Sequence, residues 1–405
     1  MIKAARRIQQ LPIGICTRIE NAIEKSRANG LEMINFGIGD SDAPTPEGIL
    51  ESLQHTIWDA ALHQSSTSIG SAAFRTAVAA WYRYQYAVEI DPEREVVALM
   101  GSREGIANLS LAYLDPGDIS LVPEPGQPSA KIGSMLAGAQ PYIVSLSPET
   151  GYRIDVGAIP VAIARRARIL WLNYPHYPTG AAADRVLFQE IVNFAREYDL
   201  LVCHDFSSGE PCGGGMPSPS ILEADGAQEV CVELGSPVKP FYLNDWRLGW
   251  AAGNAEAIAM LKMNKSAVET KAFSQHQSAA ILALRSSSDG MRDQARVYAK
   301  RRDLLIAGLN RLGWPVDSRS GTYSVWAGLP LGWSDSIEFA EALLTRCGIV
   351  VVPGEIYGKG GEGYVRLTLT VREERIREAL RRIELSGILE APAWKNKAGL
   401  ALGGM

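Results

Sequence analysis

Residues 96–123 read VVALMGSREGIANLSLAYLDPGDISLVP, and the alternation within this stretch decides the fold. Two short apolar runs, Val96–Met100 and Ile119–Pro123, flank a segment, Arg103–Leu114, in which apolar residues recur every three or four positions. Short apolar runs are typical of buried strands, and the three-to-four spacing is typical of a helix that covers a sheet. The stretch therefore predicts a β-α-β unit, the building block of a parallel sheet.

The same alternation continues to about residue 253. Val186–Tyr198 is another segment with helical spacing. Five further apolar runs are predicted as strands, namely Tyr142–Leu146, Ile169–Leu172, Leu200–Cys203, Val230–Leu234 and Gly249–Ala252. Together these elements predict an α/β domain built on a doubly wound, mostly parallel sheet.

Beyond Asn254 the character of the sequence changes. A helical tract is expected to run to about Leu284, and a charged one follows from Met291 to Leu312. Strands are then predicted at Thr322–Trp326, Ile349–Val352 and Tyr364–Leu369, before a helix at Glu373–Leu385. These elements predict a smaller α+β lobe.

Four regions follow from this reading. Residues 1–46 are expected to pack on the small lobe, because they contain too few elements to fold alone. The large domain is expected to span 47–290 and the small C-terminal domain 291–390, with a tail at 391–405.

Composition excludes several classes of protein. The chain has 405 residues, of which 46% are hydrophobic and 21% charged, as expected for a large packed core rather than a disordered chain. The net charge of −5, without a basic run, argues against nucleic acid as a partner. No apolar run reaches the length of a membrane span, and no signal peptide is recognised, so we expect a cytoplasmic protein. The scattered cysteines and histidines show no metal-ligand spacing, so no metal site is predicted.

The stretch with the most chemical information is SPVKPFYLNDWRLGW, residues 236–250, which places an arginine eight residues after a lysine. Together with other motifs in the same order along the chain, it resembles the class I/II aminotransferases, which are fold-type I pyridoxal-phosphate enzymes. The pattern is most similar to the LL-diaminopimelate and aspartate aminotransferases. The other motifs are INFGIGDSDAPTP (34–46), GSREG (101–105), LDPGD (114–118), PTG (178–180) and GYVRLTLT (363–370). The resemblance implies a three-layer fold with a mostly parallel central sheet and a smaller α+β lobe.

The resemblance also implies roles around pyridoxal 5'-phosphate. Lys239 would be the catalytic amine, because only a primary amine can condense with the cofactor aldehyde. Asp205, which follows a predicted strand, would keep the pyridine nitrogen protonated as a buried carboxylate. Arg247 would grip the phosphate, for which a planar guanidinium is suited. Taken alone, Lys239 would be a surface charge and Asp205 a turn cap, and the surrounding motifs favour the functional roles.

Further residues receive roles from the same resemblance. Gly39, Asn173 and Arg366 are implied to bind the substrate, with Arg366 as the clamp for its α-carboxylate. The residues implied to bind the cofactor are Ser102, Arg103, Glu104, Gln127, Asn173, Tyr177, Asp205, Ser208, Ser236, Lys239 and Arg247.

Several positions depart from the family pattern, and most of them surround the cofactor ring. Tyr177 stands where the family has an asparagine that binds the ring 3-oxygen, and Ser208 replaces a tyrosine that binds the same oxygen. Gln127 replaces the aromatic residue that stacks on the ring, a loss of about 1 kcal/mol of ring-holding energy. In the part of the family's site that crosses between subunits, Ser65 replaces a tyrosine and Thr270–Lys271 replace a Ser-Gly pair.

Three functions are compatible with these residues. We expect a pyridoxal-phosphate-dependent aminotransferase that acts on an α-amino acid through an external aldimine. The alternative is a specialised biosynthetic enzyme that diverts the same chemistry to elimination, replacement or cyclisation, which the changes around the ring favour. A catalytically silent relative is disfavoured, because Lys239, Asp205, Arg247 and Arg366 are all present. The resemblance further implies amino acid and keto acid substrates and a homodimer.

Overall fold

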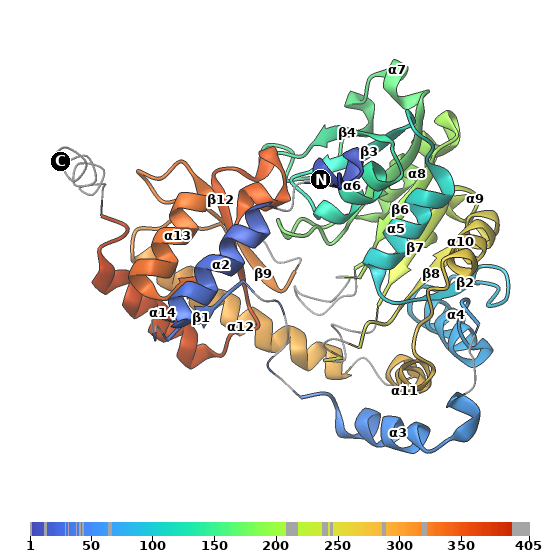
Figure 1. Ribbon diagram of the computed structural model, residues 1–405, viewed down its shortest axis with the longest axis horizontal. Helices are drawn as coiled ribbons and strands as arrows, with labels where there is room; N and C mark the ends of the chain where they lie inside the picture. Colours follow the sequence, from blue (N-terminus) through green and yellow to red (C-terminus); the bar gives the residue numbers. More distant parts are fainter. Residues whose placement is uncertain are drawn as a thin grey trace. The chain divides into compact units, whose positions relative to one another are not determined.

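The computed structural model describes residues 2–390, except 12–13, 29, 31, 38, 40–41, 43, 64–66, 208–217, 237–241, 244–245, 286–288 and 318–321. These residues form two compact units (Figure 1). The first comprises the described residues within Met1–Pro12, Asp40–Val297 and Ser320–Thr322. The second comprises those within Ile13–Gly39, Tyr298–Arg319 and Tyr323–Met405.

The described part of the first unit is built on a seven-stranded sheet in the order β2-β8-β7-β6-β5-β3-β4. Strand β8 pairs antiparallel with β2 and β7, whereas the other neighbours pair in parallel. The strands are β2 (Val96–Leu99), β3 (Ile119–Glu124), β4 (Gln140–Ser145), β5 (Ala167–Leu172), β6 (Leu201–Asp205), β7 (Cys231–Gly235) and β8 (Gly249–Gly253). Each overlaps a run predicted from the sequence, and the α/β class is confirmed.

Helices cover both faces of this sheet. Helix α5 contacts both α6 and α10, whereas α8 and α9 contact strands β6 to β8. The helices are α1 (Arg6–Gln9), α3 (Glu47–Ile57), α4 (Ala72–Tyr86), α5 (Ser102–Tyr113), α6 (Pro128–Leu136), α7 (Val161–Ala164), α8 (Arg185–Tyr198), α9 (Ala227–Val230), α10 (Ala255–Ala267) and α11 (Ser274–Arg285), with short 3-10 turns η1 (Ala60–His63), η2 (Val156–Ala158) and η3 (Ile221–Glu223). His204 of β6 lies against Phe188 of α8, whereas the adjacent Asp205 lines a pocket with Ile106 of α5. Because neighbouring side chains of a strand point to opposite faces, α5 and α8 belong to opposite layers.

The core of the first unit fixes the position of α5. Leu99 of β2, Leu109 of α5 and Leu234 of β7 are fully buried in one cluster. Burying a side chain of this size contributes about 1.5–3 kcal/mol. A Cβ on Gly105 would lie 2.7 Å from Leu99 Cδ1, so any larger residue would require the Leu99 side chain to shift. The first turn of α5 is therefore held firmly above the end of β2.

The helical tract predicted from Asn254 to Leu284 is divided in the structure. Helix α10 ends at Ala267, and α11 begins at Ser274. Glu269 has a positive φ of 55°, which turns the chain back so that Thr270 N–H donates to Lys265 O at 3.1 Å. This turn brings the Thr270 hydroxyl to Glu104 of α5, at 2.8 Å. A contact between distant segments thus overrides the local helical pattern.

The second unit contains two small sheets. Strand β1 pairs in parallel with β10, and β12 pairs antiparallel with β11 and β9. Trp314 is fully buried, and its indole N–H donates to Gly328 O at 2.6 Å. The elements are α2 (Gly14–Ala28), β1 (Ile34–Asn35), β9 (Ser324–Gly328), α13 (Ser336–Cys347), β10 (Ile349–Val350), β11 (Val352–Pro353), η4 (Gly354–Tyr357), η5 (Lys359–Gly361), β12 (Tyr364–Thr368) and α14 (Glu373–Ser386). Helix α12 (Asp289–Arg311) contains the boundary between the units, after Val297.

Candidate active site

A pocket with about 400 Å³ of open space lies at the carboxyl ends of strands β3, β5 and β6. This is the edge at which open α/β sheets bind their ligands. Most of its wall is apolar, and polar groups enter from a few positions. The lining residues are Ile106, Val122, Pro123, Gly126, Gln127, Ala130, Trp171, Leu172, Asn173, His176 and Asp205. The pocket therefore unites three of the residues implied by the sequence, Gln127, Asn173 and Asp205.

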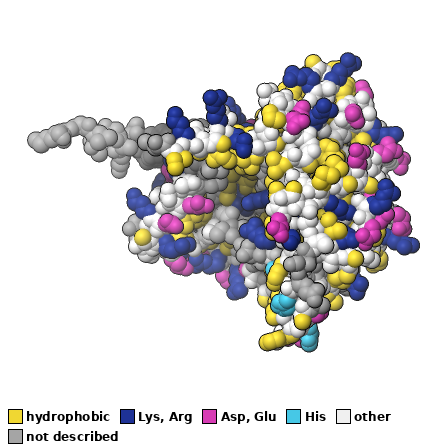
Figure 2. All heavy atoms as spheres, turned by 45° about the vertical axis from the view of Figure 1, so that its right-hand side comes forward, with side chains coloured by type: hydrophobic (Ala, Val, Ile, Leu, Met, Phe, Trp, Pro, Cys, Tyr) yellow, Lys and Arg dark blue, Asp and Glu magenta, His cyan; other side chains and the backbone are white. Residues whose placement is uncertain are grey.

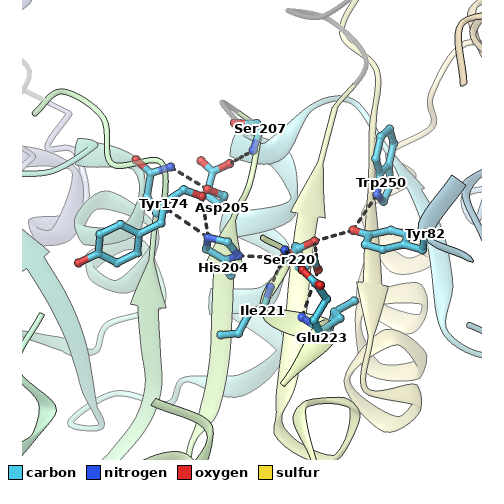
Figure 3. Close-up of polar contacts among 12 residues, drawn as sticks. Tyr82, Tyr174, His204, Asp205, Ser207, Ser220, Ile221, Glu223 and Trp250 are labelled. Atoms are coloured by element: carbon cyan, nitrogen blue, oxygen red, sulfur yellow. Dashed lines mark hydrogen bonds and ion pairs between the residues drawn. The ribbon is translucent and has the colours of Figure 1, made fainter. Parts of the chain in front are cut away.

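Asp205 is the last residue of β6, and its side chain is buried. Burial raises the pKa of the Asp205 carboxyl, although hydrogen bonds from Ser207 and Ser102 and the charge of His204 act in the opposite direction. The Ser207 N–H donates to Asp205 Oδ1 at 3.1 Å (Figure 3). A carboxylate enclosed by apolar walls is stabilised by a cationic partner. The pocket is thus suited to a ligand that presents a positive group to Asp205.

Asn173 connects the two strand ends that form the pocket. Its Nδ2 donates to Asp205 O at 2.7 Å, and its Oδ1 accepts from Tyr177 N–H at 2.8 Å. Tyr177 is buried beside the pocket, with its backbone held by this bond. Gln127 is the N-cap residue of α6 and also lines the pocket. The hydrogen bond from Tyr177 N–H to Asn173 thus fixes the backbone at one of the positions where the sequence departs from the family pattern.

His176 is a pocket residue that the sequence reasoning missed. Its Nδ1 lies 2.7 Å from Thr179 Oγ1, and burial lowers its pKa to about 3. The imidazole is therefore neutral near pH 7. Its place within the motif that ends in Pro178-Thr-Gly180 was the signal available in the sequence.

The first turn of α5 provides donors for an anion. Gly101, the N-cap residue, has a φ of 93° and no side chain to cap the helix, which leaves the N–H groups of the first turn unbonded by a cap. Such groups and the helix dipole favour a negative charge. Ser102 begins the helix, and its hydroxyl lies 3.3 Å from that of Ser207. Arg103 is exposed to solvent beside them.

The side chain of Glu104 belongs to a buried ion pair. Its Oε1 lies 2.6 Å from Lys265 Nζ, and Asn108 Nδ2 donates to the same oxygen at 2.6 Å. Its Oε2 accepts from Met100 N–H at 3.2 Å. Removing one partner of such a pair costs about 3–5 kcal/mol, because the other charge remains buried. The carboxylate therefore fixes α5 against α10, and only the backbone N–H of Glu104 is suited to contact an anionic ligand.

Ser236 and Arg247, two of the residues implied to bind the phosphate, lie on either side of the lysine in the sequence. Ser236 Oγ donates to Leu248 O at 2.8 Å, and Arg247 adopts a positive φ of 48°. The ring of Trp246 stacks on His276 at 4.8 Å, and His276 Nδ1 lies 2.9 Å from Trp246 O. An arginine in the left-handed region is uncommon, and its surroundings must hold it there. Lys239, Ser208 and Ser65 lie outside the described residues.

The second unit carries the predicted carboxylate clamp. Arg366 of β12 is 3% exposed, and its Nη2 donates to Gly37 O. Across the sheet it faces Trp326 of β9. Gly39 follows in the same loop as Gly37 and is half-buried. Arg366 is thus an almost fully buried guanidinium held by the loop after β1.

Comparison with known proteins assigns the family. The sequence pattern of the family described as aminotransferase class I and II matches residues 32–383. The chain belongs to the class I and II aminotransferases. The resemblance seen in the sequence is confirmed, and this enzyme is an aminotransferase that acts on amino acid and keto acid substrates.

Individual relatives of this aminotransferase agree with that assignment. The LL-diaminopimelate aminotransferases of Moorella thermoacetica and Desulforudis audaxviator are 46% and 44% identical, over 94% of this chain and 98% and 96% of theirs. Substrate-bound BacF from Bacillus subtilis superposes with a TM-score of 0.90 at 33% identity, covering 95% of this chain and 98% of that one. N-succinyldiaminopimelate aminotransferase from Mycobacterium tuberculosis gives 0.88 at 29% identity, covering 95% and 100%. These are fold-type I enzymes, as predicted.

Two further observations concern the described residues only. None of their helices has both the length and the apolar character needed to cross a membrane. Within the same part of the chain, no group of three or more His, Cys, Asp or Glu side chains is arranged to hold a metal ion.

Proposed function

We propose that this aminotransferase works with pyridoxal 5'-phosphate bound in the pocket at the ends of β3, β5 and β6. The observation that carries the proposal is Asp205, a buried carboxylate in a largely apolar pocket at the carboxyl ends of the parallel strands. The pKa of Asp205 is raised by burial, so a protonated pyridine nitrogen would be a stabilising partner. The residues present therefore fit the cofactor.

Several segments of the chain are proposed to bind different parts of the cofactor. The first turn of α5, with Ser102, would bind the phosphate together with Ser236 and Arg247. Lys239 would supply the amine. When bound, the cofactor supplies an aldehyde for the substrate amine and a ring that accepts electrons. The chain's own task is to hold the ring nitrogen's proton at Asp205 and to exclude water with the apolar wall.

The proposed amino donor is LL-diaminopimelate, a diamino dicarboxylic acid. Eight relatives named as LL-diaminopimelate aminotransferases are 38–46% identical to this chain over at least 94% of its length. Arg366, as a buried guanidinium, is suited to bind a carboxylate of such a substrate with two parallel hydrogen bonds.

The proposal is tested with purified protein loaded with pyridoxal 5'-phosphate. LL-diaminopimelate is offered with a panel of α-keto acids, and the new amino acid is measured by mass spectrometry. We expect at least tenfold higher kcat/KM for LL-diaminopimelate than for its DD isomer or aspartate. Failure to take up the cofactor would contradict the cofactor proposal. Ammonia or a cyclic product without a new amino acid would instead favour the diverted chemistry suggested by Gln127 and Tyr177.

Replacing Arg366 by glutamine tests the carboxylate clamp. Loss of a charged, two-pronged hydrogen bond of about 3 kcal/mol is expected to raise KM for the amino donor about 100-fold. The affinity for pyridoxal 5'-phosphate should change less than twofold. Arg381→Gln, on an exposed arginine of the same unit, is the control. Equal weakening of substrate and cofactor binding would contradict the proposed role.

We also propose a cytoplasmic homodimer. Helix α3 exposes Leu50, Ile57 and Trp58, the last with 84% of its surface accessible. Figure 2 shows hydrophobic side chains beside histidines at the lower end of the view, where Figure 1 labels α3. Apolar surface of this kind is typical of a protein contact. Analytical ultracentrifugation should find a dimer for the wild type and a monomer for Trp58→Glu, and a monomeric wild type would refute the assembly.

The division into a cofactor-binding domain at 47–290 and a small domain at 291–390 likewise stays a proposal. Limited proteolysis checks it, because cleavage is expected near residue 290 and should leave two resistant fragments. Fragments with other ends would contradict these boundaries.

A further inference from the structure

A buried polar network lies on the face of the sheet opposite to the pocket. His204 of β6 and Glu233 of β7 are both 0% exposed, and they are direct neighbours in the register of the two parallel strands. Figure 3 shows His204 together with Tyr82, Tyr174 and Ser220, which come from other segments of the chain. Charged groups are almost never fully buried unless they are paired. Burial of this network therefore costs free energy, and the packing of the sheet alone does not require it.

Glu233 is satisfied by four donors. Its Oε1 accepts from Tyr82 OH at 2.9 Å and from Ser220 Oγ at 2.8 Å. Its Oε2 accepts from Ile221 N–H at 3.0 Å and lies 2.9 Å from His204 Nδ1. These contacts give each carboxylate oxygen of Glu233 two hydrogen-bond partners, which satisfies the side chain inside the core. Glu233 thus fixes His204 Nδ1 as a donor and holds the imidazole in one orientation.

The other nitrogen of His204 reaches the segment that follows β5. His204 Nε2 lies 3.1 Å from Tyr174 N and 3.0 Å from Tyr174 O. It either accepts from the Tyr174 N–H or, when protonated, donates to the carbonyl. The imidazole therefore ties β6 to the chain at Tyr174, immediately after the pocket residue Asn173.

Both segments joined by His204 carry a residue of the pocket. Asp205 follows His204 directly on β6, and Asn173 precedes Tyr174. On the pocket side, Asn173 Nδ2 donates to Asp205 O at 2.7 Å, so the same two segments are linked on both faces of the sheet. A displacement of the imidazole would move Asp205 and Asn173 together. Geometric precision of this kind is what supporting residues provide for a binding site.

We propose that the His204–Glu233 pair is a positioning device that sets Asp205 and Asn173 for the pyridine ring of the cofactor. This inference rests on the proposed function, because it assumes that the pocket takes up pyridoxal 5'-phosphate. It assigns the pair no contact with the cofactor or the substrate.

Other titratable groups around Glu233 are unsuited to exchange a proton with it. Tyr82 and Tyr86 of α4 and Cys231 of β7 have pKa values raised by burial, so they remain neutral. Glu223 of η3 accepts from Ser220 N–H at 2.9 Å. His204 is thus the member of the network that contacts both Glu233 and the segment after β5.

The test compares two disruptive variants with one control. Glu233→Gln offers one acceptor oxygen to four donors, and His204→Gln removes the imidazole bridge. Glu229→Gln makes the same chemical change at an exposed carboxylate that pairs with Arg196 of α8, outside the network, so it is the matched control. Each variant is titrated with pyridoxal 5'-phosphate and, separately, with inorganic phosphate, which probes the phosphate site without a ring.

We expect both glutamine variants to bind pyridoxal 5'-phosphate at least tenfold more weakly, with the affinity for inorganic phosphate changed less than twofold. The pH midpoint of the bound cofactor's visible absorption should move by about one unit in these variants, because the charge held at the ring nitrogen influences the proton equilibrium that this absorption follows. Glu229→Gln should match the wild type. Equal weakening for both probes, or no weakening, would overturn the proposal.

If the variants do not fold, NMR spectra of the wild-type protein labelled with ¹⁵N-histidine test the proposal instead. The chain has five histidines, so the ring signals can be assigned by replacing the others one at a time. We expect the His204 Nδ1–H signal to shift when pyridoxal 5'-phosphate is added but not with inorganic phosphate. Cofactor binding without this shift would refute the inference alone, whereas a wild type that binds no cofactor would refute the proposed function and with it this inference.

Discussion

Asp205→Asn should lower kcat/KM about 1000-fold while leaving the unliganded protein at least as stable as the wild type. Asparagine has nearly the same shape and can still accept the 3.1 Å hydrogen bond from Ser207 N–H. It cannot carry the negative charge that would hold a proton on the pyridine nitrogen. A loss of 1000-fold corresponds to about 4 kcal/mol of transition-state stabilisation, the range found when one group of a preorganised site is removed.

The stability side of this prediction follows from the pKa of Asp205. Burial raises this pKa above the unfolded value of 3.8, so the folded protein holds a proton that the unfolded chain has released. Between the two pKa values the native state binds more protons, and the free energy of unfolding of the unliganded protein therefore falls as the pH rises. Asparagine does not titrate, so this pH-dependent loss should disappear in the variant. Urea unfolding at several pH values measures the effect.

Asp303→Asn, at a carboxylate exposed on α12, is the control for both measurements. Its activity and its pH dependence of unfolding should match those of the wild type. A variant at Asp205 that keeps most of its activity would show that the ring nitrogen needs no partner there. A variant that is inactive because it is unfolded would be recognised by its loss of stability at all pH values.

Much of the fold could be predicted because the elements are decided locally. Strands such as β2, β5 and β7 are apolar runs bounded by turns, and their period is visible without tertiary information. The division between α10 and α11 could not be predicted, because it depends on Thr270 reaching Glu104 across 166 positions of sequence. A tertiary contact of this kind produces no periodic pattern in the sequence.

The candidate site shows the same limit. Asp205 could be located because it stands after a strand within a row of ordered motifs. The role of Glu104 could not be predicted, because the sequence does not show that Lys265 forms an ion pair with its carboxylate. Glu233 was present within a predicted apolar strand, and a charge at such a place signals a buried partner. Only the order of the strands identifies that partner as His204, since β6 and β7 are neighbours in the sheet.

Lys239→Ala should abolish transamination, with a residual rate at least 10⁴-fold below the wild type. The amine is proposed to condense with the cofactor aldehyde and to move the proton of the substrate's α-carbon. Loss of a nucleophile and a general base in one residue removes both contributions, and general acid–base catalysis alone supplies about 10²–10⁴-fold. The proposed phosphate donors at α5, Ser236 and Arg247 remain, so cofactor should still bind, though more weakly.

Lys239→Arg separates the chemistry of the amine from its charge. Arginine keeps the positive charge but remains protonated, so it cannot act as a nucleophile or base near pH 7. It should therefore be as inactive as the alanine variant. Borohydride reduction of the loaded wild type should attach the cofactor to the peptide that contains Lys239, and both variants should lack this label. Attachment at Lys265 or another lysine would overturn the assignment, because the eight-residue spacing to Arg247 would then have no functional meaning.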